Sequence, residues 1–119
     1  MKNAHAVAAL AALAQDSRLA LYRLLVRRGP EGYAAGEIAA RLRIPAPTLS
    51  FHLKALTQAS LVTVRKESRF IYYSANFEHM SRLMAFLNDH CCSLASAGAS
   101  PACAAPRASI TVVNKRQAA

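Results

Sequence analysis

Acidic residues, cysteines and long apolar runs are all scarce in this chain of 119 residues. It has six Asp and Glu residues, three Cys and no Trp. An odd and small number of cysteines argues against the disulfide framework of a secreted domain and favours reduced thiols with ligand or redox chemistry. No apolar run reaches the roughly 18 to 20 residues that a membrane span needs. We therefore expect a soluble protein in a reducing compartment, the cytoplasm, with no membrane attachment.

Basic residues are abundant by contrast. Fifteen Lys and Arg residues give a net charge of +9, which is typical of a protein whose partner is itself polyanionic. Nucleic acid is the leading candidate, although a ribosomal or membrane-surface partner would give the same total. The placement of the charges along the chain must decide between them.

The apolar pattern predicts a single, mostly α domain (α+β class) with about five helices and one two-stranded β-hairpin. The N-terminal Ala/Leu-rich stretch is interpreted as a helix of the mature protein and not as a signal sequence. The predicted helices cover residues 4–15, 17–28, 36–42, 47–58 and 76–94. The third and fourth helices are separated only by the sequence "RIPA", which predicts a helix-turn-helix.

The fourth helix has two different faces. Leu49, Leu53 and Leu56 form an apolar stripe at positions i, i+4 and i+7, and Phe51 and Lys54 point away from it. An aromatic side chain directed away from the core suggests contact with a thymine methyl group in DNA. His52 lies nearer the buried edge, where a structural hydrogen bond is as plausible as a phosphate contact. Plain helix packing is the alternative interpretation of this pattern.

Residues 61–66 and 69–75 are β-branched or aromatic and nearly alternate in polarity, which predicts a β-hairpin with a polar tip around Glu67 and Ser68. Arg65, Lys66 and Arg69 gather near that tip, where they could meet a phosphate backbone. A solvated basic surface is the alternative. A helix-turn-helix followed directly by a cationic hairpin is a winged-helix arrangement, in which the second helix enters the major groove and the wing contacts the flanking backbone.

Residues 10–25 ("LAALAQDSRLALYRLL"), 36–75 and 88–92 ("NDHCC") resemble the ArsR/SmtB family of metalloregulatory repressors, and within it the arsenite-responsive ArsR branch. The resemblance covers about residues 7–92 and is most specific in "TLSFHLKAL" and the adjacent cysteines. It implies a winged-helix homodimer, assembled through its first and last helices. The dimer would bind double-stranded operator DNA and repress its operon until an inducer binds. It also assigns DNA contacts to residues of the fourth helix and of the wing: Thr48, Ser50, His52, Lys54, Arg65, Lys66 and Arg69.

Two metal sites known in that family are not reproduced in this sequence. The Cys-x-Cys pair of one arsenite sensor would fall in "YAAGEI", which has no cysteine. His79 and His90 keep the eleven-residue spacing of zinc-sensing relatives, but Phe77 replaces the acid and Ser93 the next ligand. Two imidazoles alone make a poor tetrahedral zinc site, so solvent-facing histidines are favoured and a second metal is left open.

All three cysteines lie near the end of the sequence. Cys91 continues an apolar seam along the predicted last helix and could simply be a buried residue in a dimer interface; Cys92 lies off that seam, and Cys103 falls in a low-complexity segment, residues 93–119, that we expect to be flexible. Thiolates are soft ligands, and three of them suit As(III) or Sb(III), which bind three sulfurs in a trigonal pyramid. We therefore predict that Cys91, Cys92 and Cys103 bind the inducer and change the end of the dimer helix, which releases the operator.

Two alternatives remain open at this point. On the same fold, a repressor could respond to thiol oxidation, to persulfide or to zinc, with Cys103 as the disulfide partner in the redox case. A small thiol oxidoreductase is disfavoured, because the sequence has no C-x-x-C motif in a βαβ context, no phosphate-binding loop and no acid pair. We expect a protein that is not an enzyme.

Overall fold

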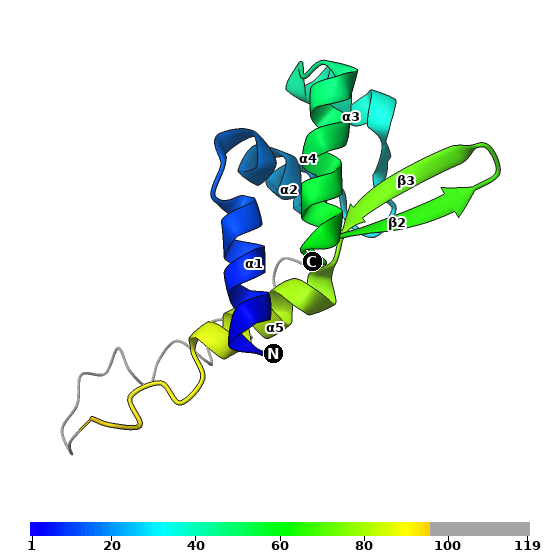
Figure 1. The fold of residues 1–119 in the computed structure, drawn as a ribbon. Helices are drawn as coiled ribbons and strands as arrows, with labels where there is room; N and C mark the ends of the chain where they lie inside the picture. Colours follow the sequence, from blue (N-terminus) through cyan, green and yellow to red (C-terminus); the bar gives the residue numbers. More distant parts are fainter. Residues whose placement is uncertain (96–119) are drawn as a thin grey trace. The chain divides into compact units, whose positions relative to one another are not determined.

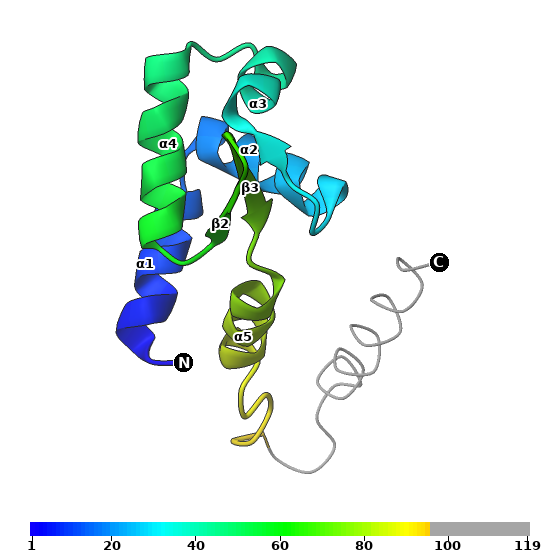
Figure 2. The same ribbon diagram turned by 90° about the vertical axis from the view of Figure 1, so that its right-hand side faces the viewer.

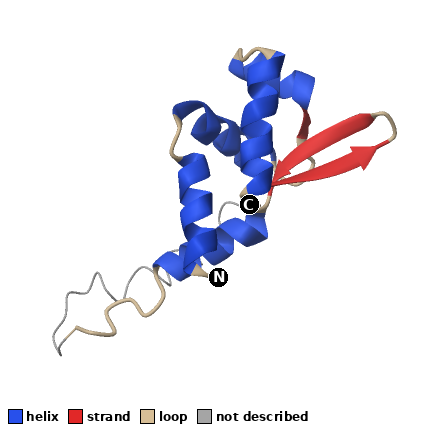
Figure 3. Cartoon of the chain, viewed as in Figure 1, coloured by secondary structure: helices blue, strands red, loops and turns tan. Residues whose placement is uncertain are grey.

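The computed structural model describes residues 1–95 and confirms the winged helix-turn-helix (Figures 1 and 3). The chain divides into two units, Met1–Leu87 and Asn88–Ala119. Among residues 1–95, no helix is long and apolar enough for a transmembrane segment. The elements are α1 (Asn3–Leu13), α2 (Asp16–Arg28), β1 (Tyr33–Ala34), α3 (Ala35–Leu42), α4 (Ala46–Gln58), β2 (Val62–Glu67), β3 (Phe70–Ala75) and α5 (Phe77–Leu87).

The helix-turn-helix consists of α3 and α4. Helix α3 ends at Leu42, the capping residue Arg43 adopts a left-handed conformation (φ 55°), and Pro47 occupies the first turn of α4. Proline fits this position because the first backbone N–H groups of a helix have no partner within the helix. The predicted apolar stripe of α4 is confirmed, since Leu49, Leu53 and Leu56 are all buried.

One hydrophobic core joins the elements of Met1–Leu87. Ala6 and Ala9 are the buried residues of α1, and Leu83 is the buried residue of α5. The small buried alanines let α1 pack close to its neighbours. The larger side chains Val7 and Leu10 lie on the outward face of the helix and are exposed. The largest fully buried side chains come from α2, α3, α4 and the residue before β2: Leu21, Leu25, Ile38, Leu49, Leu56 and Leu61.

The sheet has three strands and not the two that the sequence predicted. Strand order is β1-β3-β2, all antiparallel, and the extra strand β1 pairs Tyr33 with Tyr73. It lies between the predicted helices 17–28 and 36–42, where the sequence predicted no strand, because two residues are too few to show the alternation of a strand. Gly32 permits this pairing: its φ is +73°, and a Cβ there would lie 2.5 Å from the Tyr73 carbonyl oxygen. Only glycine fits so close to another backbone.

The hairpin of β2 and β3 is the wing, and it projects from the helices (Figures 1 and 2). Its strands pair from Val62 with Ala75 to Glu67 with Phe70, and Ser68 in the connecting turn has a φ of 59°. This register places the tip at Ser68 and Arg69, one residue beyond the predicted position.

The last helix is shorter than predicted. We expected it to reach residue 94, but α5 ends at Leu87 and residues 88–94 form successive turns, with left-handed backbone at His90 and Cys92. Asn88 and Asp89 follow the helix directly, and their short polar side chains compete with helical hydrogen bonding. Cys91 therefore does not lie on the helix, and the prediction that His79 and His90 share a helical face is wrong.

Candidate nucleic-acid interface

The outward face of α4 is the predicted one. Thr48, Ser50 and Lys54 are exposed, and Phe51 in the middle of the helix is 66% exposed. An exposed phenylalanine gains nothing for the core, whereas it offers a large apolar surface to a partner. This face combines hydroxyl groups, one aromatic ring and one cation, which are groups that contact base edges and phosphates in DNA.

His52 was predicted among the DNA contacts, but it belongs to the core. Its side chain is 7% exposed, and its Nδ1 atom has no hydrogen-bond partner among the described residues. The residue follows Leu49 by three positions, and this spacing turns it towards the buried stripe. Its burial favours the structural role that the helical wheel had left open, and its contact with a phosphate stays a prediction.

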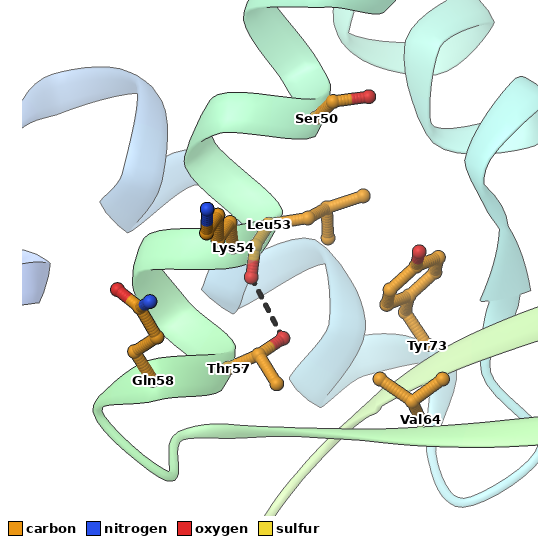
Figure 4. Close-up of a pocket in the computed structure, with 7 residues that line it drawn as sticks. All are labelled: Ser50, Leu53, Lys54, Thr57, Gln58, Val64 and Tyr73. Carbon is orange, nitrogen blue, oxygen red and sulfur yellow. Dashed lines mark hydrogen bonds between the residues drawn. The ribbon is translucent and has the colours of Figure 1, made fainter.

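A groove of about 400 Å³ runs between α4 and the wing (Figure 4). Val64 and Tyr73 of the wing and Leu53 of α4 give it apolar surface. Polar side chains of α4 complete the lining. Within it, the Thr57 hydroxyl donates a hydrogen bond to the Leu53 carbonyl oxygen (2.7 Å). The polar lining consists of Ser50, Lys54, Thr57 and Gln58.

The two faces of the wing carry different cations. Val64 is paired with Tyr73, and both line the groove. Because side chains alternate along a strand, Lys66 and its pairing partner Ile71 share that face, while Arg65 lies on the opposite face. Lys66 is thus directed to the same side as α4, and Arg65 is not.

Arg65 is bound by the protein itself. Its guanidinium donates hydrogen bonds to the carbonyl oxygens of Pro30 (3.3 Å) and Glu31 (3.1 Å) and forms an ion pair with Glu67 (3.0 Å). It also lies 5.0 Å from the centre of the Tyr72 ring. These contacts do not support the predicted DNA contact of Arg65. Lys66 and Arg69 are exposed and form no ion pair within residues 1–95.

Of the three predicted metal ligands, two lie together. The Sγ atoms of Cys91 and Cys92 are 3.4 Å apart, and both residues are partly buried. Cys92 is disulfide-bonded in this structure, so one ion could bind both sulfurs, with metal–sulfur bonds of about 2.3 Å as in zinc thiolates, only once that disulfide is reduced. Cys103 lies outside the described residues. Within residues 1–95, no three His, Cys, Asp or Glu side chains are grouped so that they could hold a metal.

The histidines considered for zinc occupy different surroundings. His79 is partly buried, and its Nε2 atom has no hydrogen-bond partner in the described part of the chain. His90 is exposed, with its Nε2 atom 3.5 Å from a carboxylate oxygen of Asp89. Only His79 belongs to α5, so the helical geometry that the zinc alternative needs is absent.

Sequence reasoning missed several residues around these elements. Thr57, Gln58, Val64 and Tyr73 line the groove, and alternation along the hairpin could have identified the last two. It also missed Tyr33, whose ring lies 4.9 Å from the guanidinium of Arg28 and 4.6 Å from that of Arg41. No local signal indicates this stack, because it depends on β1.

Comparison with known proteins agrees with this architecture. Residues 13–65 match a family model described as a helix-turn-helix domain. Over 63 residues the chain is 41% identical to the HTH-type transcriptional regulator YceK of Bacillus subtilis (strain 168), a match that covers 53% of this chain and 62% of the relative. The chain therefore spans less than two thirds of that curated relative.

Two solved structures are similar over a larger share of their length. One, described as a possible transcriptional regulator for arsenical resistance, is 32% identical, with 66% of this chain and 79% of the other covered and a TM-score of 0.56. The other is the homodimeric winged helix-turn-helix DNA-binding domain of Mb0332 from Mycobacterium bovis, a possible ArsR-family regulator. It is 31% identical to this chain, the match covers 70% of this chain and 74% of the other, and the TM-score is 0.59. With its fold, its exposed α4 face and these similarities, the chain belongs to the ArsR/SmtB family of winged helix-turn-helix transcriptional regulators.

Proposed function

We propose that this chain is a homodimeric repressor that leaves its operator when As(III) or Sb(III) binds Cys91, Cys92 and Cys103. The inducer assignment rests on the 3.4 Å separation of the Cys91 and Cys92 sulfurs, which one ion could bridge once the Cys92 disulfide is reduced. A similar structure described as a possible regulator for arsenical resistance also supports it.

In the proposed complex, α4 enters the major groove, which is wide enough to admit a helix. Thr48, Ser50 and Phe51 contact base edges, because they occupy its exposed face. The sugar-phosphate strand follows the groove between α4 and the wing, where Lys54 and Lys66 neutralise phosphates and apolar surface meets the sugars. Arg69 at the wing tip contacts the flanking backbone.

The proposed dimer uses α1 and α5, which contact each other within the protomer (Figures 1 and 2). Exposed apolar side chains of both helices support this choice, because a partner would remove them from water. Two-fold symmetry then requires an inverted-repeat operator with half-sites roughly 34–36 Å apart. The exposed side chains are Val7, Leu10, Phe77, Met84 and Leu87.

The proposed inducer site is linked to the dimer through the chain itself. Cys91 follows the end of α5 at Leu87 by four residues, and the intervening turn is held by a hydrogen bond from the Cys91 N–H to the Asn88 carbonyl oxygen (3.0 Å). An ion that also binds Cys103 would reorganise this turn and the adjoining end of α5. A coupling of about 1–3 kcal/mol would weaken DNA binding roughly 5- to 150-fold.

The test is fluorescence anisotropy of an operator fragment bound by the reduced protein, titrated separately with arsenite, antimonite, zinc and peroxide. The proposal predicts release by arsenite and antimonite at concentrations where zinc and peroxide have no effect. X-ray absorption of the arsenite complex should then count three sulfurs around arsenic. Release by peroxide alone would favour the redox alternative, and release by zinc alone would favour the zinc alternative.

A further inference from the structure

The contacts of Arg65 give this residue a role that differs from that of the other wing cations. Its side chain lies on the wing face opposite the groove, and all three guanidinium nitrogens donate hydrogen bonds within the protein, to Pro30, Glu31 and Glu67. The first two acceptors are 35 and 34 positions away in the chain. Arg65 therefore connects the wing to the loop between α2 and β1.

That loop is itself fixed from its other side. Arg28, at the end of α2, donates a hydrogen bond from Nε to the Gly32 carbonyl oxygen (3.0 Å) and lies over the Tyr33 ring (4.9 Å). Gly29 and Gly32 take φ values of 93° and 73°, which side-chain-bearing residues rarely adopt. The carbonyls that accept hydrogen bonds from Arg65 thus belong to a loop that Arg28 also contacts.

The wing needs such a connection. The base of the hairpin is held in the core by the buried Val62 and Ala75, but residues 63–71 are exposed, and an isolated two-stranded hairpin is only marginally stable. β1 pairs with β3 at Tyr72 and Tyr73, whereas β2, at the other edge of the sheet, pairs with β3 alone. Among the contacts described above, Arg65 is the one that joins β2 to the α2–β1 loop.

We infer that Arg65 is a positioning residue: it holds the wing at the angle at which Lys66 and Arg69 meet DNA, and it does not bind DNA itself. The planar, forked guanidinium suits this role, because it can reach two carbonyls and stack on the Tyr72 ring at once. The inference rests on the proposed role of the wing in DNA binding. It also makes the α2–β1 loop a determinant of operator affinity, although the loop has no predicted DNA contact.

The salt dependence of operator binding separates a positioning residue from a phosphate ligand. Loss of a phosphate contact reduces the slope of log affinity against log salt by about 0.9. Lys66→Ala should show this reduction. Arg65→Ala should instead lower the affinity by roughly three- to tenfold at every salt concentration, with an unchanged slope, because the loss is that of a partly exposed hydrogen-bonded anchor. Arg65→Lys should not restore affinity, since an ammonium group cannot reproduce the fork.

A glycine substitution tests the same connection without changing any charge. Gly32→Ala places a Cβ against the Tyr73 carbonyl and displaces the loop, so it should reproduce the Arg65→Ala result. Gly36→Ala is the matched control, because its Cβ would meet no atom within 4 Å and its backbone needs no positive φ. Thermal unfolding of each variant shows whether it is folded before DNA is added.

A measurement on the unmodified protein covers the case in which a variant fails to fold. In NMR spectra, the resonance of the Arg65 Nη–H groups, which donate to Pro30 and Glu31, should be protected from water in the free protein and keep its position when operator is added. A flattened salt slope in Arg65→Ala, recovery of affinity in Arg65→Lys, or a large shift of that resonance on DNA binding would overturn the inference. Failure of the parent protein to bind any duplex would contradict the proposed function, and Arg65 would then have no such role.

Discussion

Replacement of Phe51 by alanine should weaken operator binding without weakening the fold. A phenylalanine side chain buries about 150–250 Å² when fully covered, and Phe51 is 66% exposed in the free protein. About 100–165 Å² is thus available for DNA. If a thymine methyl and its neighbours cover about half of that area, the contact is worth about 1–2 kcal/mol at about 25 cal/mol per Å². We expect operator affinity to fall about 5- to 30-fold.

The same substitution should leave the free energy of unfolding unchanged or slightly higher. Little buried area is lost, and alanine favours a helix by about 0.5 kcal/mol over phenylalanine. The assay compares anisotropy of an operator duplex and a random duplex at one salt concentration, with urea unfolding as the check on stability. Val26→Ala is the matched control, since Val26 is an exposed apolar residue on α2, and neither quantity should change.

For Phe51→Ala, binding to the random duplex should change by less than about twofold, because nonspecific binding comes from phosphate contacts. An equal loss on both duplexes would refute the base-reading role of this residue. Unchanged binding to both would show that α4 does not present Phe51 to DNA at all.

Three further outcomes follow from the structure. Lys54→Ala and Lys66→Ala should each reduce the salt slope of operator binding by about 0.9, whereas Arg23→Ala on the exposed surface of α2 should not change it. Met84→Glu places a charge on the proposed dimer surface, where Met84 is 45% exposed, and sedimentation velocity should then show a monomer at micromolar concentration. Burial raises the pKa of Tyr22 from 10.0 to about 12, so the unfolded chain ionises first and stability should fall by roughly 2 kcal/mol between pH 10 and pH 12; urea unfolding of Tyr22→Phe should lack this loss.

Each of these outcomes can fail in a distinct way. Equal salt slopes in the parent and in both lysine variants would contradict the proposal that the sugar-phosphate strand lies in the groove. If the Met84→Glu variant still sediments as a dimer, α5 is not part of the interface. The same alkaline loss in the parent and in Tyr22→Phe would show that another group causes it.

Much of the fold could be predicted from periodicity alone. The leucine stripe of α4 repeats at helical spacing and the hairpin alternates, so both elements and the outward direction of Phe51 followed from local pattern. Strand β1 could not be predicted, because its pairing depends on Gly32 approaching Tyr73, a contact between positions far apart in the sequence. The end of α5 was missed because the apolar spacing continues to Leu94 beyond the residues that stop the helix.

The candidate site was predicted less completely than the fold, for similar reasons. Residue type and position identified Lys54, Lys66 and Arg69 as exposed cations, and they are exposed. The same reasoning placed Arg65 with them, because charge clusters are visible in a sequence while backbone acceptors in a distant loop are not. His52 shows a second limit: a helical wheel locates the border of the buried face only approximately, and packing decides on which side a residue lies.

The central claim is that cysteine-bound arsenite releases the operator, and the most direct measurement is an arsenite titration of the operator complex of Cys92→Ser. Ser93→Ala is the matched control, because it changes the neighbouring residue by one hydroxyl and leaves all three cysteines in place. In both variants the DNA affinity without arsenite should equal that of the parent. The account predicts that arsenite releases DNA from the parent and from Ser93→Ala but not from Cys92→Ser; full release from Cys92→Ser at the parental arsenite concentration would contradict it.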